Sequence, residues 1–571
     1  MLTLGMVHMF SSRQTPTRAF ARATAALLFA IATAGLTGLA TPALGSSYVE
    51  SGSDNPVSAQ PPVTRPPTKH CTVTLAHQFP SNAADGAPQQ FSGTFTPPTD
   101  CKGPWAKVVL DFSSSVSGRQ YDRSASISVG GTTIWFGTTQ EPGGDTPTVA
   151  HMSKDVTRYE ALFTHPQPFS GGIGNYTSSV YTGVFVQDAT LTFYEADAQH
   201  PAPPEPDRVV GLSVPDLTPG ANSADVPLPT LPRNLTRADL EVTLKGNGCD
   251  EQWFTAVPDD VNSAFGDGLC GAGPYREADF SLDGTPAGAV GTYPHIYSGG
   301  IVPALWRPVL AIDTLDLRPE NLDLTPFVGR LVDGGEHTLG VRIPQINDRW
   351  NVVGTLFLWT DHHRAQTSGH LTRVEVQTEP TIADSHHPSG TGDQQDYTTT
   401  GKRHDVIVGY VDTSRGRVYT TDTYDRSFSQ TGSVSNGGWT QSIDQTDHVQ
   451  QSSVSTLGTT NPGARVVRRW NLAETYPIRV DFTGSYTDGQ NYQLEATVDM
   501  GQQVAEQGTG VPDQQWKWTL DSYGIQARSA GDITALDGHS TTQYDGTDDL
   551  GIMHRNRIET EHGRVTSSTS R

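Results

Sequence analysis

Residues 108–136 have the sequence VVLDFSSSVSGRQYDRSASISVGGTTIWF, and this stretch decides the fold class of the chain. Residues 108–112, 124–129 and 132–136 are rich in Val, Ile, Leu and aromatic side chains, and the middle run alternates small polar with apolar residues. Such runs, separated by glycine-containing turns, predict short β-strands. Together with similar runs at 180–186 and 190–194, they give residues 71–198 the proportions of a β-sandwich.

The same pattern returns in residues 209–378, which predict a second sandwich, and in residues 404–571, which predict a C-terminal β-rich domain. A short sequence also repeats between the first two blocks, because Asp155-Val156-Thr157 resembles Asp323-Leu324-Thr325. The fold class expected from these patterns is all-β, with two related β units in tandem followed by a third. The strand candidates of the second block are residues 240–244, 278–282, 338–343 and 352–358.

Segments rich in Pro, Ser, Gly and Asp separate these blocks. We expect flexible linkers at residues 46–70, 199–208 and 379–403. The 571 residues are enough for about three domains, and 35% hydrophobic content with 58 Gly and 39 Pro favours short strands over long helices. The net charge of −23 disfavours nucleic acid and anionic membranes as partners.

The N-terminus has the pattern of a signal peptide. Arg13, Arg18 and Arg22 precede an apolar run at residues 25–39, and small residues follow. This order predicts that residues 1–45 are removed by cleavage near residues 43–45. A transmembrane anchor is the alternative, but the apolar run is shorter than the ~20 residues that a membrane span requires. The expected mature protein is exported and secreted.

The four cysteines all follow this leader, and export permits disulfides. Four cysteines allow three pairings. The local choice pairs Cys71 with Cys101 and Cys249 with Cys270, each within one predicted domain. Each bond would add roughly 3 kcal/mol by loop entropy. A metal site is the alternative, but the Cys-x-x-Cys and Cys-x-x-His spacings are absent.

Residues 271–308 concentrate polar and aromatic side chains that make poor core material. They include Arg276, Glu277, Tyr297, Trp306 and Arg307. Arginine binds planar oxygen groups and aromatic faces cover sugar rings, so this stretch suggests a site for a polar ring-shaped ligand. The structural alternatives are a salt bridge at a strand edge for Arg276-Glu277 and a buried Trp beside a snorkelling Arg for Trp306-Arg307.

Two further polar loops contain carboxylates. Asp122-Arg123 stands at the mouth of a predicted strand, as a structural ion pair or as a positioned base with its arginine. The second loop holds Asp250, Glu251 and Trp253 beside Cys249, as a solvated turn or a ligand loop. The Gly-x-Ser-x-Gly, His-Glu-x-x-His and phosphate-loop motifs are absent, so any chemistry rests on carboxylates and water.

Eight blocks of this sequence resemble the plant peptide:N-glycanase A family and follow its order. The resemblance is dense over residues 71–361. It implies an amidase that hydrolyses the bond between the asparagine side chain and the first N-acetylglucosamine, releasing the intact glycan and leaving aspartate. A related bacterial peptide:N-glycanase implies two jelly-roll β-sandwiches with the site where they meet. The blocks are VVLDF at 108–112, QYDR at 120–123, KDVTRY at 154–159, YTGV at 181–184, DEQWF at 250–254, GPYRE at 273–277, YSGGI at 297–301 and LWRP at 305–308.

The resemblance also implies roles for individual residues. The essential aspartate of the bacterial relative lies in an Asp-Arg pair at a strand start, and this role falls on Asp122. Its second carboxylate has no counterpart between Cys270 and Arg276, where Ala272 falls nearest. The expected second acid is therefore Glu277, followed by Glu251 and Asp250. The residues expected to hold substrate oxygens are Arg123, Arg276 and Arg307, and those expected to stack on sugars are Trp253, Tyr297 and Trp306.

The predicted function is thus a secreted amidase acting on N-glycosylated peptides or proteins, with no metal or organic cofactor. A monomer without nucleic-acid or stable membrane partners is expected. Two alternatives remain open: a glycosidase that uses the same carboxylates to cut between sugars, and a glycan-binding protein without chemistry. An amidase leaves aspartate on the peptide, whereas a glycosidase leaves one sugar on asparagine.

Overall fold

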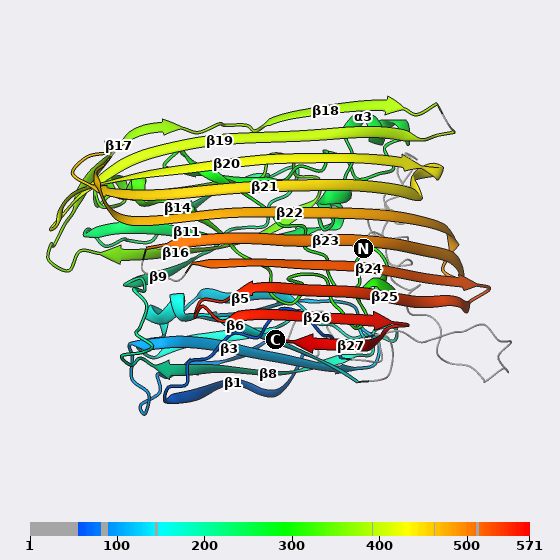
Figure 1. Ribbon diagram of the computed structural model, residues 1–571, viewed down its shortest axis with the longest axis horizontal. Coiled ribbons are helices and arrows are strands. Elements are labelled where there is room, and N and C mark those ends of the chain that lie inside the picture. Colours follow the sequence, from blue (N-terminus) through cyan, green and yellow to red (C-terminus); the bar gives the residue numbers. More distant parts are fainter. Residues whose placement is uncertain (1–54, 82–89, 143–146, 391, 462, 510–512) are drawn as a thin grey trace.

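The computed structural model describes residues 55–81, 90–142, 147–390, 392–461, 463–509 and 513–571. The predicted signal peptide and its cleavage site lie outside these residues. The chain forms three β units, and the long strands of the third lie across the other two (Figure 1). No helix in the described part of the chain is long and apolar enough to cross a membrane.

The first unit is a sandwich of two four-stranded antiparallel sheets. Their strand orders are β1-β8-β3-β6 and β2-β7-β4-β5. The pairs follow a jelly roll, in which the first strand pairs with the last and the chain winds inward. The 3-10 helix η1 (Thr157–Phe163) follows β6. The strands are β1 (His70–Ser81), β2 (Phe91–Phe95), β3 (Trp105–Ser117), β4 (Ser124–Val129), β5 (Thr132–Thr138), β6 (Thr148–Asp155), β7 (Gln167–Ile173) and β8 (Val184–Glu195).

The second unit repeats this topology strand for strand. Its sheets have the orders β10-β15-β12-β13 and β14-β11-β16-β9, which are the same positions of a jelly roll counted from β9. The strands are β9 (Arg208–Leu212), β10 (Ser223–Pro227), β11 (Leu235–Asn247), β12 (Glu277–Leu282), β13 (Thr285–Gly291), β14 (Glu320–Asp323), β15 (Thr338–Arg342) and β16 (Arg349–Thr360). The helices are η2 (Gly248–Asp250), η3 (Trp253–Thr255), α3 (Asp259–Ala264), η4 (Pro303–Trp306), η5 (Thr325–Phe327) and α4 (Val328–Leu331).

The repeated Asp-x-Thr sequence occupies the same place in both units. Asp155 ends β6 and Asp323 ends β14, the sixth strand of each roll. In each, the carboxylate accepts a hydrogen bond from the backbone N–H of the threonine two residues later, at 2.9 Å for Thr157 and 2.8 Å for Thr325. A 3-10 helix follows both turns. The predicted all-β fold with tandem jelly-roll sandwiches is therefore confirmed.

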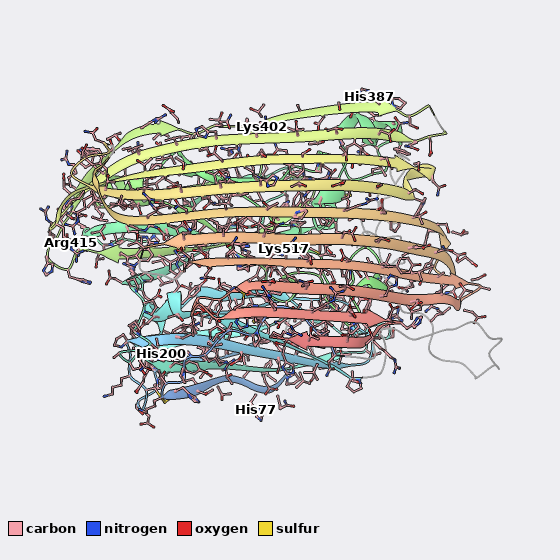
Figure 2. The ribbon with its side chains drawn as sticks, in the orientation of Figure 1. His77, His200, His387, Lys402, Arg415 and Lys517 are labelled. Carbon is pink, nitrogen blue, oxygen red and sulfur yellow. A yellow bond between two sulfur atoms is a disulfide. The ribbon has the colours of Figure 1, made fainter. Side chains whose placement is uncertain are left out.

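The third unit is one sheet that runs from β17 to β27, with β18 paired to β19 outside the main path. Buried and exposed residues alternate along its strands, so one face packs inward and the other meets solvent. Lys402 on β19 and Lys517 on β24 are exposed on this sheet (Figure 2). Its elements are β17 (Ser368–Glu375), β18 (Thr381–Pro388), β19 (Gln395–Thr413), β20 (Gly416–Ser435), η6 (Asn436–Gly438), β21 (Thr440–Leu457), β22 (Arg465–Asp488), β23 (Asn491–Gly508), β24 (Gln514–Ser529), β25 (Asp532–Thr547), β26 (Met553–Glu561) and β27 (Arg564–Ser570).

Two segments expected to be linkers are ordered instead. Residues 381–388 form β18 and residues 395–403 begin β19, and these two segments pair antiparallel, with Thr381 opposite Lys402 and Pro388 opposite Gln395. Residues 55–69 lie against the body of the protein, where Val57 forms a parallel bridge with Val309 and Thr64 contacts Asp548. Pro and Ser content therefore indicated irregular backbone in the second case, but not a free chain.

The structure contains both predicted disulfides, Cys71–Cys101 and Cys249–Cys270. The first joins β1 to the segment that precedes β3 in the first sandwich. The second brackets the loop between β11 and β12, and buries Cys249 and Cys270 against Ala256. This loop is one of those that build the site described next.

Candidate active site

Asp122 lies in the loop between β3 and β4, at the end of the first sandwich that faces the second. Its side chain is almost completely buried, and Oδ2 accepts a hydrogen bond of 3.0 Å from the backbone N–H of Gly299. Gly299 belongs to the loop after β13 of the second sandwich. This bond therefore joins the two jelly rolls at the carboxylate with the predicted base role.

Gly299 also shows where a second carboxylate stands. A Cβ atom on Gly299 would come within 1.9 Å of Glu141 Oε2 and 3.3 Å of Asp122 Oδ2. Only glycine leaves room for both carboxylates at this point. Glu141 follows β5, and its Oε1 is 3.4 Å from Nη2 of Arg307, in a pair whose side chains are each 11% exposed.

The loop after β11 brings a third acid to the cluster. Glu251 is buried, and the charges that act on its pKa are Asp122 and Lys245. Lys245 Nζ lies 4.9 Å from the ring centre of Tyr297 and donates a 2.8 Å hydrogen bond to Asn247 Oδ1. Glu251 and Asp122 both raise the pKa of buried Tyr297, after burial itself. Carboxylates of both rolls thus converge around Tyr297 and Gly299.

The positions of these acids follow from the repeated topology. Asp122 lies between the third and fourth strands of the first roll, and Glu251 lies between the third and fourth strands of the second. Glu141 and Gly299 lie in the loops after the fifth strand of each roll. Corresponding loops project from the same end of a jelly roll. The site is therefore built by the same two loops of each sandwich, facing one another.

Burial and mutual repulsion separate the proton affinities of the three acids. Burial raises the pKa of Asp122, while the Gly299 N–H and the Lys245 charge lower it. Burial, and then the charge of Asp122, raise the pKa of Glu251 to about 8. Burial raises that of Glu141 to about 7; Arg307 lowers it and Asp122 raises it further. The negative charge of Asp122 therefore favours the protonated form of both glutamates.

Two neighbouring side chains are buried without partners. Both carboxyl oxygens of Glu251, and the amide oxygen and nitrogen of Gln252, have no hydrogen-bond partner among the described residues. Both residues are 4% exposed. An unpaired buried polar group costs about 1–3 kcal/mol, which a protein tolerates where a ligand completes the pairing. These groups are therefore candidates to bind the reacting part of a substrate.

Arg123 takes a different place from the one predicted. Its guanidinium donates to Gln120 Oε1 at 2.6 and 3.1 Å, and it lies 3.6 Å from the ring centre of Tyr121 and 4.0 Å from that of Tyr176. Such stacking holds the two tyrosines in place beside Asp122. Tyr176 is 38% exposed, so this cluster, with Tyr181, forms an aromatic rim next to the carboxylates.

Glu277 lies elsewhere, in the interface between the second sandwich and the C-terminal sheet. Its oxygens bond to Arg403 at 2.9 and 3.3 Å and accept a 2.6 Å hydrogen bond from the Tyr275 hydroxyl. Among the described residues, none of its bonding partners belongs to the Asp122 cluster. Glu277 was predicted because it follows the region that lacks an acid, but its partners are the long strands, which sequence spacing does not reveal.

We expect Glu277→Gln to lower stability rather than the rate of the chemical step. The substitution weakens the bonds to Arg403 but touches none of the clustered acids. Thermal unfolding and kcat per folded molecule, measured on one preparation, would separate the two effects. A large loss of kcat in a protein of unchanged stability would restore the catalytic role first predicted for Glu277.

Arg276 and Asp250 form a scaffold under the site. Both side chains are fully buried, and Arg276 Nε donates to Asp250 Oδ1 at 2.8 Å. The other oxygen of Asp250 accepts the backbone N–H groups of Asn347 and Asp348 at 2.8 and 2.7 Å. These bonds occupy both oxygens of Asp250 and Nε of Arg276, and Arg276 Nη1 donates to the Gly273 carbonyl at 2.7 Å. Of the polar side-chain atoms of this pair, only Nη2 of Arg276 is buried without a partner in the described part of the chain. The pair therefore positions the loop that carries Glu251.

The predicted stacking residues are buried in the core. Trp253 is 2% and Trp306 1% exposed, and the Trp306 indole donates to the Gly300 carbonyl at 2.7 Å. Neither face is open to a sugar ring. Trp306 instead fixes the Gly299-Gly300 turn, while Arg307, next in the chain, reaches Glu141. Tyr297 is buried too, but lies within the cluster.

Three further residues of the cluster were not predicted from the sequence: Glu141, Lys245 and Gln252. A signal for Glu141 was present, since residues 139–141 are polar and follow a predicted strand at the same end of the sandwich as Asp122. Gln252 adjoins Glu251 in a loop already considered. Lys245 continues a predicted strand, and nothing local distinguishes it from a surface lysine. No group of three metal-ligating side chains occurs among the described residues.

The family model described as "Peptide N-acetyl-beta-D-glucosaminyl asparaginase amidase A" matches residues 56–377. The chain belongs to this family. The match spans both jelly rolls and every member of the carboxylate cluster. As a member of the amidase A family, the chain is an amidase, a hydrolase that acts on a carbon–nitrogen bond.

The chain is similar to one curated protein and to several solved structures. The peptide-N4-(N-acetyl-beta-glucosaminyl)asparagine amidase A of Prunus dulcis is 29% identical over 483 residues, which cover 79% of this chain and 81% of that protein. PNGase F of Flavobacterium meningosepticum is 14% identical, covers 51% of this chain and 96% of its own, and has a TM-score of 0.34. PNGF-II is 16% identical with coverages of 52% and 66% and a TM-score of 0.36.

Proposed function

We propose that this amidase hydrolyses the bond between an asparagine side chain and N-acetylglucosamine, which releases an intact glycan and leaves aspartate. One observation carries the assignment of the site: Asp122 and Glu141 of the first jelly roll meet Gly299 of the second, in the cluster that also holds Glu251 of the second roll. An amide hydrolase needs a base for water and an acid for the leaving nitrogen, and this arrangement supplies both.

In the proposed reaction, Asp122 accepts a proton from water as the water oxygen attacks the side-chain carbonyl carbon of asparagine. The carbon–nitrogen bond then breaks, and Glu251 gives its proton to the leaving nitrogen of the glycosylamine. Arg307 and Lys245 offset the negative charge that develops among the carboxylates. Gln252, with no partner of its own, is available to donate to the amide oxygen and to accept from a sugar substituent.

The proposed substrates are N-glycosylated peptides or proteins. The aromatic rim of Tyr121, Tyr176 and Tyr181, in which Tyr176 is exposed, is the place where sugar rings would stack, next to Asp122. The two disulfides fit folding in an oxidising compartment, and we propose that the enzyme acts outside the cell that makes it.

The direct test is incubation of the full-length protein with a purified glycopeptide, followed by mass analysis of both products. The proposed amidase yields a peptide in which aspartate replaces asparagine, together with the whole glycan. A peptide that keeps one sugar on asparagine would identify a glycosidase instead, and binding without product would leave only a glycan-binding protein.

We expect kcat/KM to fall as the pH rises through about 8, since Glu251 then loses the proton that the leaving nitrogen needs. The apparent value belongs to the coupled acids rather than to one residue. The Glu251→Gln variant should be slower by roughly 10²-fold or more and should lose this alkaline limb. A pH–rate profile of both proteins checks this, and an alkaline limb of the same position in the variant would contradict the role.

The Gln252→Met variant should gain about 1 kcal/mol in stability, because it removes a buried amide that lacks partners. It should also lose roughly tenfold in kcat/KM, as the amide no longer meets substrate. Urea unfolding and steady-state kinetics measure the two effects.

Gln430→Met is the matched control. Gln430 is also buried, but its amide donates to the Phe254 carbonyl at 2.7 Å and to Gln445 Oε1 at 2.9 Å. The Gln430→Met variant should therefore be less stable than the wild-type protein. Equal destabilisation of both variants would mean that Gln252 is satisfied in the free protein.

A further inference from the structure

A second cavity lies at the far end of the strands that carry the active-site loops. Its volume is about 610 Å³, within the usual range of ligand pockets. It reaches Lys107 near the start of β3 and Arg237 near the start of β11, whereas Asp122 and Glu251 follow the other ends of these strands. The eight residues from Arg237 to Lys245 span about 26 Å at 3.3 Å per residue. The cavity is therefore separate from the carboxylate cluster.

All three units of the protein contribute walls to this three-unit cavity. The first sandwich supplies Lys107 and Arg158, and the second supplies Arg237 and Trp359. The C-terminal sheet supplies β22 with Trp470, and residues 203–205 between the sandwiches close one side. The cavity thus exists only when the long sheet is docked on both sandwiches.

Two tryptophans in this lining are half-buried and held in place. The Trp470 indole donates to Glu506 Oε1 at 2.7 Å, and the Trp359 indole donates to the Pro204 carbonyl at 3.2 Å. The Arg237 guanidinium lies 3.8 Å from the centre of the Trp359 ring. Val467, beside Trp470 in the lining, is 38% exposed. Arg237 covers one face of Trp359, so Trp470 and Val467 supply most of the aromatic and apolar surface of the cavity.

The charged side chains of the lining neutralise one another. Lys107 pairs with Asp549 at 2.6 Å, and Arg468 pairs with Asp323 at 2.7 Å. Arg158 pairs with Asp239 at 2.9 Å and donates to Asn321 at 2.6 Å. Such pairing leaves little net charge for a phosphate or other strong anion. It also holds carboxylate and amide oxygens in fixed positions, each with lone pairs to spare.

We propose that the three-unit cavity binds a neutral oligosaccharide. Rigid tryptophan faces cover the apolar side of sugar rings, and immobilised planar polar groups bond their hydroxyls at little entropic cost. The ligand is either a remote branch of the glycan whose core lies at Asp122 or a second glycan of the same protein. The inference goes beyond hydrolysis; the first of these two sources rests on the proposed function, in which the glycan core lies at Asp122, and the second does not.

Calorimetric titration of the Asp122→Asn protein with a glycopeptide that carries one N-linked oligosaccharide tests this proposal. We expect Trp470→Ala, added to that protein, to weaken binding by about tenfold or to remove one class of site. Two glycopeptides per protein would indicate separate glycans, and one would indicate a branch of the same glycan. Unchanged affinity and stoichiometry in the Trp470→Ala protein would overturn the proposal.

Two controls keep the result interpretable. Tyr419→Ala removes another partly exposed aromatic of the same sheet, outside the cavity, and should leave binding unchanged. Titration of wild-type protein with the free oligosaccharide measures binding that does not require the glycopeptide to be a substrate.

Hydrogen exchange serves if Trp470→Ala does not fold. Saturating oligosaccharide should slow exchange in the Asp122→Asn protein at the backbone amides of Glu205 and of residues 467–470. Protection confined to the loops around Asp122 and Glu251 would refute the cavity as a binding site.

Discussion

The Asp122→Asn variant is expected to fold normally and to lose about 10³-fold in kcat, since removal of a positioned general base typically has an effect of that order. Asparagine has nearly the same shape, and its Oδ1 can still accept the Gly299 N–H that Asp122 accepts at 3.0 Å. The substitution therefore removes the charge but keeps the contact between the two jelly rolls. Steady-state release of glycan from a glycopeptide, with thermal unfolding as a check of the fold, measures the effect.

The same variant makes a second, independent result available. The charge of Asp122 raises the pKa of both Glu141 and Glu251. Without it, both glutamates should ionise at lower pH, and the alkaline limb of the residual activity should move in that direction. Asp188→Asn is the matched control, since Asp188 is a more exposed aspartate of the same sandwich that bonds Gln78 and His77. Near-normal glycan release by Asp122→Asn would remove Asp122 from the mechanism.

The sequence predicted the fold more completely than the site, for a physical reason. Strand periodicity is a local property of the sequence, so a short alternating run such as residues 124–129 indicates a β-strand without knowledge of the rest of the fold. The Asp-x-Thr sequences at Asp155 and Asp323 also indicated that the first two units are related. The site depends on which loops of two separate rolls face each other. Asp122 was found through its resemblance to a family, while Glu141 required the contact at Gly299 to be seen.

The predicted site residues that lie outside the carboxylate cluster share one feature. Arg276, Trp253, Trp306 and Glu277 are polar or aromatic residues near the site in sequence, and each was expected to touch substrate. In the structure they are buried under the loops or against the C-terminal sheet, where arginine–carboxylate pairs and indole N–H groups fix the backbone. Sequence alone does not distinguish a side chain that binds a ligand from one that stabilises its own loop.

The interface of the C-terminal sheet provides the other large expected effect. Arg403 on β19 is 1% exposed and lies among three carboxylates: Glu277 at 2.9 Å, Asp279 at 2.6 Å and Asp405 at 3.0 Å. Its Nη1 also donates to the Gln377 carbonyl at 2.6 Å. We expect Arg403→Met to destabilise the protein by about 3–5 kcal/mol, because removal of one partner leaves buried charges uncompensated. Urea unfolding of the full chain measures the loss.

A matched exposed pair sets the scale for this comparison. Arg417 bonds Asp412 at 2.8 Å, but both side chains meet solvent, at 42% and 30% exposure. Arg417→Met should cost no more than about 1 kcal/mol. If Arg403→Met costs as little as Arg417→Met, the buried network contributes nothing to the docking of the long sheet.

The pH dependence of the Arg403→Met penalty tests its electrostatic origin. Burial, and then Glu277, already raise the pKa of Asp279 to about 7, above its value of about 3.9 in an unfolded chain. A carboxyl whose pKa is raised by folding stabilises the folded state at low pH, and that contribution is lost as the pH rises through the folded value. Removal of Arg403 raises the pKa of Asp279 in the folded protein further. The loss of stability caused by Arg403→Met should therefore be smaller at pH 5 than at pH 8. A penalty that does not change with pH would point to lost packing of the arginine side chain instead.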